Sequence, residues 1–228
     1  MGDGPIPQEL KFTAPTTAGA VSALVMMPPD ARAMLVLGHG AGAGMRHAFM
    51  DAVARRLAAR RVATFRYQFP FTERGARRPD PRPVLLATVR AAVVTARGTT
   101  RGLPLFAGGK SMGGRMTSMA AAATPLDGVR GIVFLGFPLH PAGRPGSDRA
   151  AHLSHVTVPM LFLNGTRDRL ARLELLEPVC EHLGSSARLR VVEGADHSFH
   201  VLKRSGRTDE DVLDELAETT GKFVIALI

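Results

Sequence analysis

Short apolar runs alternate with longer segments of helical composition from one end of the chain to the other. The apolar runs predict strands at Val21–Met26, Ala33–Gly38, Val62–Tyr67, Leu103–Ala107, Gly131–Gly136, Pro159–Leu163 and Arg188–Val192. The segments between them predict helices at Arg46–Arg60, Val84–Arg97, Met112–Ala123, Arg172–Leu183 and Glu210–Ile228. Most of the predicted strands are uninterrupted apolar runs, which is typical of a parallel sheet with helices on both faces. We therefore predict an α/β fold, a doubly wound and mostly parallel sheet of about seven or eight strands.

The junction between the Leu103 strand and the Met112 helix carries the pentapeptide Gly109-Lys-Ser-Met-Gly113. This is G-x-S-x-G in the strand, sharp turn and helix context that its chemistry needs. Glycines at its flanks let strand and helix approach closely, so the hydroxyl of Ser111 is expected to stand exposed above the end of the sheet. An isolated serine at this position can also be a helix cap. The context favours a nucleophile.

Two further candidates also follow predicted strands. Asp168 comes after the Pro159 strand, and His197 comes after the Arg188 strand. A serine hydroxyl becomes a good nucleophile when an imidazole takes its proton, and a carboxylate then stabilises the imidazolium. The chain order Ser111, Asp168, His197 is the one expected of an α/β-hydrolase. We therefore predict that these three residues are catalytic.

Each of these candidates has a competing interpretation. Asp168 could make an Asx-turn, and His197 could be a surface histidine, with His200 and Asp196 close by as rivals. We prefer His197 because His200 lies further into the following segment. Asp196 is disfavoured as the acid because adjacent side chains rarely face one another.

A glycine-rich loop, Gly38-His-Gly-Ala-Gly-Ala-Gly44, follows the Ala33 strand. Acyl transfer develops an oxyanion that needs preorganised backbone N–H donors. We assign the oxyanion hole to the amides of Met112 and Ala41, and expect the substrate to contact His39, Gly40, Gly42, Tyr67, Lys110 and Arg74. A phosphate loop is the alternative, but the segment lacks the Lys-Ser ending of a P-loop and the G-x-G-x-x-G spacing.

Composition narrows the class of protein. The chain of 228 residues fits one domain, 1–228, with a single large core. No apolar run is long enough for a membrane span, and the start Met1-Gly-Asp-Gly-Pro-Ile-Pro7 lacks the features of a secretory signal. One cysteine, Cys180, excludes an internal disulfide and fits a reducing compartment. We therefore expect a cytoplasmic protein without a membrane partner.

The net charge of +9 raises the question of nucleic-acid binding. Of the 29 basic residues only Lys11, Lys110, Lys203 and Lys222 are lysines, a skew that indicates codon bias. The chain has no Trp and one Tyr, so the aromatic residues on which bases stack are scarce. We expect no nucleic-acid partner. An anionic small-molecule substrate is compatible with the charge.

With these motifs in view, the chain resembles an α/β-hydrolase over essentially its whole length. More narrowly, it is similar to small dienelactone-hydrolase-like proteins, in the branch of the testis-expressed hydrolase-like protein and a non-specific-lethal chromatin-complex subunit. The resemblance rests on Gly38–Gly42, Phe65–Phe71 with Arg77–Asp80, Gly108–Arg115, Gly136–Pro141 and Asn164–Asp168. It implies that Ser111, Asp168 and His197 occupy the family's triad positions. True dienelactone hydrolases carry a cysteine nucleophile, so the serine here argues against that substrate.

Two features bear on the substrate. The segment between Gly136 and the Pro159 strand is too short for a sizeable helical lid, which predicts a shallow, open site. Lys110 precedes the nucleophile and either pairs with a carboxylate such as Glu73 or is solvated. Several arginines lie in or beside loops that follow strands: Arg46, Arg74, Arg77, Arg78, Arg144, Arg167 and Arg169. If two of them face Ser111, substrates that carry a carboxylate are favoured.

The sequence therefore predicts a serine hydrolase, of carboxylesterase or thioesterase type, for small soluble esters. It predicts no cofactor and no metal, and it does not determine the oligomeric state. The alternative is a catalytically idle hydrolase fold that serves as an interaction module. A peptidase shares the triad and would normally bring a further domain.

Overall fold

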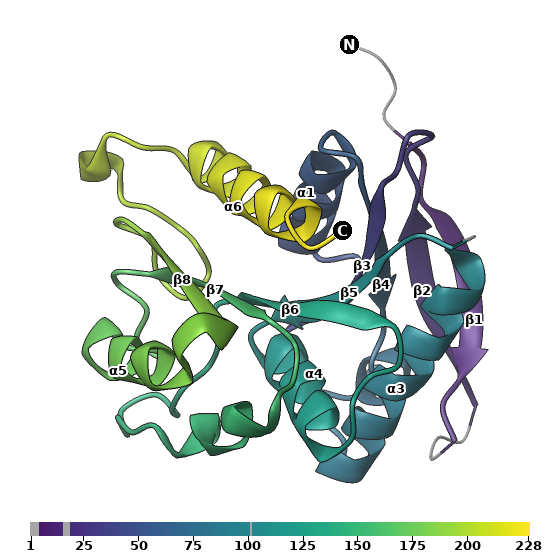
Figure 1. Cartoon of the computed structure of the whole chain (residues 1–228), viewed down its shortest axis with the longest axis horizontal. Coiled ribbons are helices and arrows are strands. Elements are labelled where there is room, and N and C mark those ends of the chain that lie inside the picture. Colours follow the sequence, from purple (N-terminus) through teal and green to yellow (C-terminus); the bar gives the residue numbers. More distant parts are fainter. Residues whose placement is uncertain (1–4, 16–18, 101) are drawn as a thin grey trace.

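An eight-stranded sheet forms the centre of the computed structural model, which describes residues 5–15, 19–100 and 102–228 (Figure 1). Its strands are β1 (Gln8–Thr13), β2 (Ala20–Met26), β3 (Ala33–Gly38), β4 (Val62–Tyr67), β5 (Leu105–Lys110), β6 (Val129–Leu135), β7 (Met160–Gly165) and β8 (Ala187–Val192). They lie in the order β1-β2-β4-β3-β5-β6-β7-β8. The pairs β1–β2 and β2–β4 are antiparallel, and every other neighbouring pair is parallel. The predicted fold class is confirmed.

Helices cover both faces of this sheet. Figure 1 shows α1 (Ala48–Ala58) and α6 (Asp209–Ile225) together on one face, and α3 (Arg82–Thr99), α4 (Met112–Ala123) and α5 (Leu173–Leu183) on the other. The short helix α2 (Pro70–Glu73) follows β4. Three 3₁₀ segments, η1 (Asp148–His155), η2 (Gly184–Ser186) and η3 (Lys203–Ser205), lie in connections. The connection between β6 and β7 thus holds only η1, and no helical lid covers the sheet edge.

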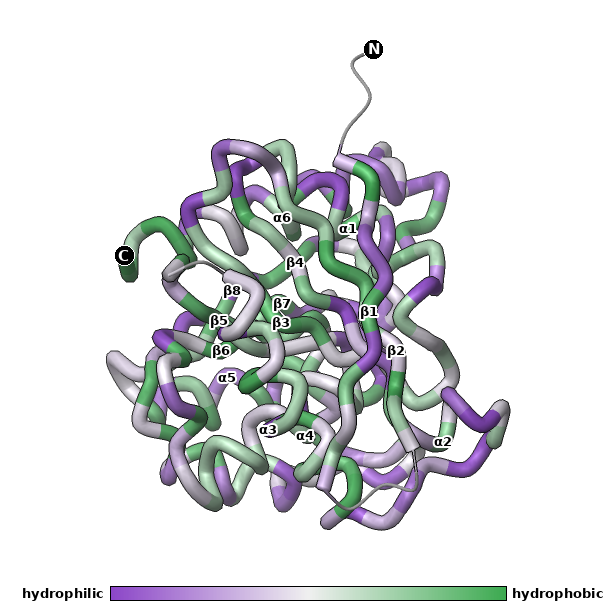
Figure 2. The backbone as a smooth tube through the Cα atoms, turned by 90° about the vertical axis from the view of Figure 1, so that its right-hand side faces the viewer, coloured by the Kyte–Doolittle hydropathy of each residue, from purple (hydrophilic) through white to green (hydrophobic). Residues whose placement is uncertain are grey.

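The two layers explain why the central strands are apolar without interruption. In β3, Met34 and Val36 pack into the core under α3 and α4, whereas Leu35 and Leu37 pack into the core under α1 and α6. Successive side chains of a strand point to opposite faces, so a strand buried on both faces needs apolar residues at every position. Figure 2, viewed from the β1 edge, shows hydrophilic stretches on the periphery, including part of β1 and the connection near α2.

The structure differs from the sequence-based elements at the edges and ends. Strand β1 was not expected: it is an edge strand whose burial is mostly partial or absent, so it lacks the apolar run that identified the others. Strand β5 begins later than predicted and continues through two glycines to Lys110. The sequence analysis expected no secretory signal at residues 1–7, and the first four of these residues lie outside the described residues. In the part of the chain that is described, no helix combines the length and apolar character needed to span a membrane.

Because β3, β5, β6, β7 and β8 are parallel, their carboxyl ends meet at one edge of the sheet. The predicted nucleophile, acid, base and glycine-rich loop all follow these strands. Ligands of such sheets bind outside these strand ends. The fold therefore brings the candidate residues to one edge.

Candidate active site

Ser111 occupies a sharp turn between β5 and α4. Its backbone has φ 50° and ψ −113°, a conformation that residues other than glycine rarely adopt. The turn needs glycine on both sides: a Cβ added at Gly109 or Gly113 would lie 2.2 or 2.1 Å from the carbonyl oxygen of Gly38. The helix and the strands can approach this closely only because side chains are absent there. Ser111 is thereby held at the very end of the sheet.

Three side chains form a hydrogen-bonded chain at this point. The Nε2 atom of His197 lies 2.9 Å from the Oγ atom of Ser111. Its Nδ1 atom lies 2.7 Å from Oδ2 of Asp168. Asp168 is almost fully buried, whereas Ser111 and His197 are partly exposed. A carboxylate that accepts from Nδ1–H leaves Nε2 free to accept the serine proton.

The rival residues have other partners. The Nδ1 atom of His200 lies 2.9 Å from a carboxylate oxygen of Asp209, which begins α6. The Oδ1 atom of Asp196 accepts hydrogen bonds from the amides of Ser198 at 2.8 Å and His200 at 3.0 Å. Asp196 therefore closes the tight turn that carries His197, and neither rival belongs to the chain that ends at the serine.

A buried histidine supports the loop that carries Asp168. The Oδ1 atom of Asp168 accepts from the amide of Leu170 at 2.7 Å. The amide of His140, from the connection after β6, donates to the carbonyl of Leu170 at 3.0 Å. The ring of His140 contacts the carbonyl of Pro141 through Nδ1 at 2.9 Å and the amide of Arg172 through Nε2 at 3.5 Å. Sequence reasoning singled out the motif of His140 without assigning this role.

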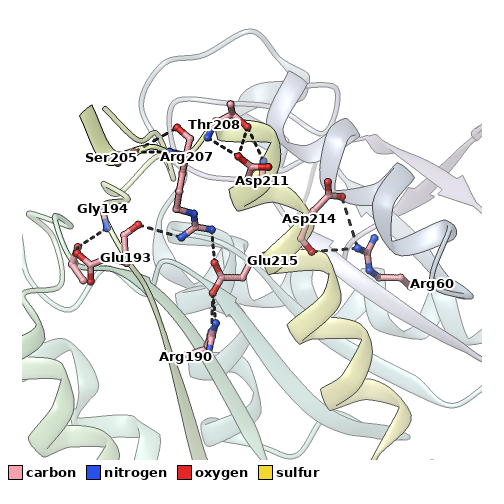
Figure 3. A network of polar contacts seen from close by, with 11 residues as sticks. Arg60, Arg190, Glu193, Gly194, Ser205, Arg207, Thr208, Asp211, Asp214 and Glu215 are labelled. Carbon is pink, nitrogen blue, oxygen red and sulfur yellow. Dashed lines mark hydrogen bonds and ion pairs between the residues drawn. The ribbon is translucent and has the colours of Figure 1, made fainter. Parts of the chain in front are cut away.

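An ion-pair network anchors the segment that follows β8 and carries His197 (Figure 3). Arg207 donates to the carbonyl of Glu193 at 3.4 Å and pairs with Glu215 of α6 at 2.6 Å. Glu215 also pairs with Arg190 of β8 at 2.7 Å. The two ends of the segment are therefore tied to the same helix, which fixes the direction in which it leaves the sheet.

Lys110 contacts the same segment at His197. Its Nζ atom donates to the carbonyl oxygen of His197 at 2.6 Å. It also lies 5.4 Å from the ring centre of Phe199 and 6.0 Å from that of Phe49, and these two rings stack. Burial lowers the pKa of Lys110 to about 8, although nearby carboxylates oppose the change. The suggested pair with Glu73 is wrong, because that carboxylate accepts hydrogen bonds from a serine in β2.

His39 holds the glycine-rich loop from inside the protein and does not face a substrate. It is fully buried. Its Nε2 atom accepts from the amide of Phe69 at 3.1 Å, so Nδ1 carries the proton and donates to the carbonyl of Gly40 at 2.8 Å. The same carbonyl accepts from the amide of Ala43 at 3.2 Å. Burial lowers the pKa of His39 to about 4, so the ring is neutral at pH 7.

The glycine-rich loop lies against the nucleophile. A Cβ at Gly40 would lie 3.8 Å from the Cβ of Ser111, which places the loop backbone beside the serine. Met112 is the first residue of α4, and the first amides of a helix have no intrahelical acceptor. Ala41 is exposed beside Gly40. The assignment of the Met112 and Ala41 amides to an oxyanion hole stays a prediction that this arrangement permits.

Four of the expected substrate contacts need correction. Tyr67 is fully buried under α3 and α4, and burial raises its pKa, so it cannot contact a substrate. Lys110 is directed to the His197 carbonyl, and His39 is directed to the loop backbone. Arg74 pairs with Asp80 at 2.6 Å.

Two open hollows lie near the site, one beside the glycine-rich loop and one beside His197. The first, of about 710 Å³, is lined by the loop 41–44 together with Arg46, Gln68, Phe71 and Arg77. The second, of about 480 Å³, is lined by Arg167, Arg169, Asp196, His197 and Ser198. In the described ranges, no three His, Cys, Asp or Glu side chains are close enough to hold a metal ion. The site therefore offers a nucleophile and a base, with open space beside His197 and beside the glycine-rich loop.

The neutral His39 makes the fold sensitive to acid. In the unfolded chain its pKa returns to about 6.5, so between pH 6.5 and about 4 the unfolded state binds a proton that the folded state does not. Stability must therefore fall as the pH falls through this range. We expect His39 to account for about 2 to 3 kcal/mol of lost unfolding free energy between pH 7 and roughly pH 4.5.

Urea unfolding at these two pH values measures the effect. His39→Gln should be less stable at pH 7 and should lose less stability on acidification than the wild type. His155→Gln, at an exposed histidine, is the matched control and should keep the wild-type dependence. Equal acid dependence of His39→Gln and wild type would contradict the neutral assignment.

Comparisons with known proteins agree with this fold. The family model described as alpha/beta hydrolase domain matches residues 31–225. A dienelactone hydrolase from Anabaena variabilis is similar in structure, with 21% identity, a TM-score of 0.79, and 99% of this chain and 100% of that chain covered. A protein from Xanthomonas campestris described as an α/β serine hydrolase without lid has 20% identity and a TM-score of 0.74, with 96% and 95% covered.

A third similar structure is Est1E from Butyrivibrio proteoclasticus, with 16% identity and a TM-score of 0.70, covering 96% of this chain and 99% of that chain. At these identities the structural likeness concerns the fold. The family match spans most of the chain, from β3 to the end of α6. This chain therefore belongs to the family of proteins with an alpha/beta hydrolase domain.

Proposed function

We propose that this protein is a serine hydrolase that cleaves small, soluble esters or thioesters through an acyl-enzyme intermediate. The observation that carries the proposal is the hydrogen-bonded chain from Ser111 Oγ through His197 to the buried Asp168, with contacts of 2.9 and 2.7 Å. These distances lie within the range for proton transfer between a nucleophile and its base. Membership of the hydrolase family supports the same class of reaction.

In the proposed reaction, Ser111 attacks the carbonyl carbon while His197 takes the hydroxyl proton at Nε2. Asp168 keeps the ring in the required tautomer and stabilises the imidazolium. The tetrahedral intermediate then collapses: the bond to the leaving oxygen or sulfur breaks, and His197 returns the proton to that atom. Water then gives a proton to the same ring and attacks the acyl-enzyme. The bond to Ser111 Oγ breaks, His197 returns the proton to that oxygen, and the acid is released.

The oxyanion that forms in both steps needs donors beside Ser111. We assign this role to the amides of Met112 and Ala41, the first at the start of α4 and the second in the loop beside Gly40. His39 contributes indirectly, because it fixes the carbonyl of Gly40 and hence the path of that loop. Removing one such donor typically costs about 3 to 4 kcal/mol of transition-state stabilisation.

Size and openness restrict the substrate. The β6–β7 connection contributes only the 3₁₀ segment η1, so no lid of described residues encloses the hollows beside His197 and the loop 41–44. Long acyl chains bind in enclosed apolar tunnels, which such an edge does not provide. The narrower resemblance to the testis-expressed and non-specific-lethal hydrolase-like branch fits this compact form, and we propose it as the closer kinship.

Activity should therefore fall as the acyl chain lengthens. p-Nitrophenyl esters of graded length should give the highest kcat/KM for acyl groups of roughly two to four carbons. Longer chains should be poorer by about tenfold or more, because their additional carbons lose conformational freedom beside the site without being buried. A preference for long chains would contradict the open-site account.

Ser111→Ala is the control for this series. It should abolish hydrolysis of every ester and should not react with a fluorophosphonate probe that labels the wild type. A folded wild-type protein that hydrolyses no ester and takes no label would instead support the alternative, an idle hydrolase fold that serves as an interaction module.

Lys110 is expected to position His197 through its backbone carbonyl. Lys110→Met keeps the length of the side chain and removes the donor, so His197 should lose part of its alignment. We expect kcat to fall about ten- to a hundredfold with little change in KM, since small misplacements of reacting groups have effects of this size.

The control for Lys110→Met is Lys222→Met, because Lys222 makes an exposed pair with Glu218 on α6, away from the loop. It should keep the wild-type kcat. An unchanged kcat in a folded Lys110→Met protein, or a rise in KM without a fall in kcat, would contradict the positioning role.

A further inference from the structure

The hollow beside His197 carries a charge pattern that the reaction itself does not require. Arg167 and Arg169 line it together with Asp196, His197 and Ser198. The two arginines flank Asp168 in the chain, in the turn after β7. Alternate residues of this turn therefore differ in burial. The aspartate is buried beneath the histidine, and both arginines are exposed at the rim.

Neither arginine is neutralised by an ion pair with another described residue. Arg167 is anchored: its amide donates to the carbonyl of Ala195 and its Nη1 atom donates to that of Gly194, each at 2.9 Å. Its remaining guanidinium donors are left for other acceptors. Arg169 makes no hydrogen bond or ion pair within the described part of the chain. By contrast, Arg190 and Arg207, a short distance along β8 and its connection, both pair with Glu215.

The carboxylates of Asp168 and Asp196 near the hollow already accept hydrogen bonds from other groups. Asp168 accepts from Leu170 and His197. Asp196, the single carboxylate in the lining, accepts two backbone amides within its own turn. Two guanidinium groups therefore face this space against one hydrogen-bonded carboxylate, and the hollow attracts anions.

The position of the hollow indicates which half of a substrate would occupy it. The Nε2 atom of His197 faces Ser111, and in the proposed reaction this atom protonates the leaving oxygen. The leaving group must then lie beside His197, and the hollow lined by Arg167 and Arg169 is the one that His197 also lines. The acyl group and its oxyanion belong beside the loop 41–44, at the other hollow.

We propose that Arg167 and Arg169 form a subsite for a carboxylate on the leaving group, so that the preferred substrates are short-chain esters of small hydroxy acids. This inference rests on the proposed function and adds the substrate class. A guanidinium binds a carboxylate through two parallel hydrogen bonds, which lysine cannot reproduce. The volume of about 480 Å³ accommodates a small leaving group.

A matched pair of substrates tests the proposal. 4-Acetoxybenzoate and its methyl ester share the acetyl group and differ in the charge of the leaving group. The wild type should have about a tenfold or higher kcat/KM for the anion at low salt, and added salt should reduce the ratio. The double variant Arg167→Ala/Arg169→Ala should bring the ratio to about one.

The control variant removes the same charge elsewhere. Arg32 and Arg130 are exposed at the amino ends of β3 and β6, the opposite edge of the sheet. Arg32→Ala/Arg130→Ala should keep the wild-type ratio. Lys substitutions at 167 and 169 should recover only part of it, because they restore charge without the paired hydrogen bonds.

Other outcomes overturn the proposal. A wild-type ratio near one, or a ratio that survives the double variant, would do so. A preference for an anionic acyl group, seen with p-nitrophenyl hemisuccinate over the valerate and removed by Arg77→Ala, would place the charge selection at the other hollow.

The subsite can be tested even if hydrolysis fails. Calorimetric titration of Ser111→Ala with 4-hydroxybenzoate, the anionic leaving group, should show binding that Arg167→Ala/Arg169→Ala weakens by about tenfold. Absence of binding would refute the subsite, while inactivity with binding intact would refute only the proposed reaction.

Discussion

The close approach of α4 to β3 at the carbonyl of Gly38 is the constraint on which the site depends. A Cβ at Gly109 or Gly113 would lie about two ångströms from that oxygen, so a side chain at Gly113 would force α4 away from β3, and one at Gly109 would force β5 away from β3. With the helix held there, the chain must turn within one residue, and Ser111 adopts a positive φ. Such strained backbone persists where the surrounding structure enforces it. The exposed hydroxyl, the free amide of Met112 and the proximity of His197 all follow from this packing.

The loops around Ser111 are held by buried polar groups rather than by a lid. His39 and His140 make the same pair of contacts. Each ring contacts the carbonyl of the next residue through Nδ1 and a distant backbone amide through Nε2. Each ring can satisfy two backbone groups that would otherwise be buried without a partner. Lys110 holds the turn of His197 by donating a hydrogen bond to the backbone carbonyl of that residue. The site is thus preorganised by contacts beneath it and stays open above.

Much of this could be predicted from the sequence, because the relevant signals are local. The apolar runs of β3 and β4 and the helical pattern of α4 gave their bounds as the structure has them, since strands buried on both faces carry apolar residues throughout. The chemistry of Ser111, Asp168 and His197 could be inferred from residue type and chain order, and the structure joins these side chains as that order requires.

What the sequence could not supply is the direction of side chains. Tyr67 ends a strand and His39 follows one, as ligand-binding residues do, yet both are buried, because the packing of α3, α4 and the Phe69 segment covers them. Lys110 could have faced Glu73 or solvent, and the choice depends on a turn more than eighty residues away. Strand β1 could not be predicted from an apolar run, because an edge strand exposes polar positions. Likewise, only the folded structure separates Arg167 and Arg169 from arginines that have partners.

The most direct test of the central claim is to detect the covalent intermediate itself. The wild type is mixed with p-nitrophenyl acetate, quenched in acid within the first turnover and analysed by intact-protein and peptide mass spectrometry. The account predicts a mass increase of one acetyl group, located on Ser111, together with a burst of p-nitrophenol whose amplitude matches the enzyme concentration. An acetyl group on another residue would contradict the account. The experiment is repeated at low pH, where deacylation is slow. Turnover of the ester there without an adduct or a burst would also contradict the account.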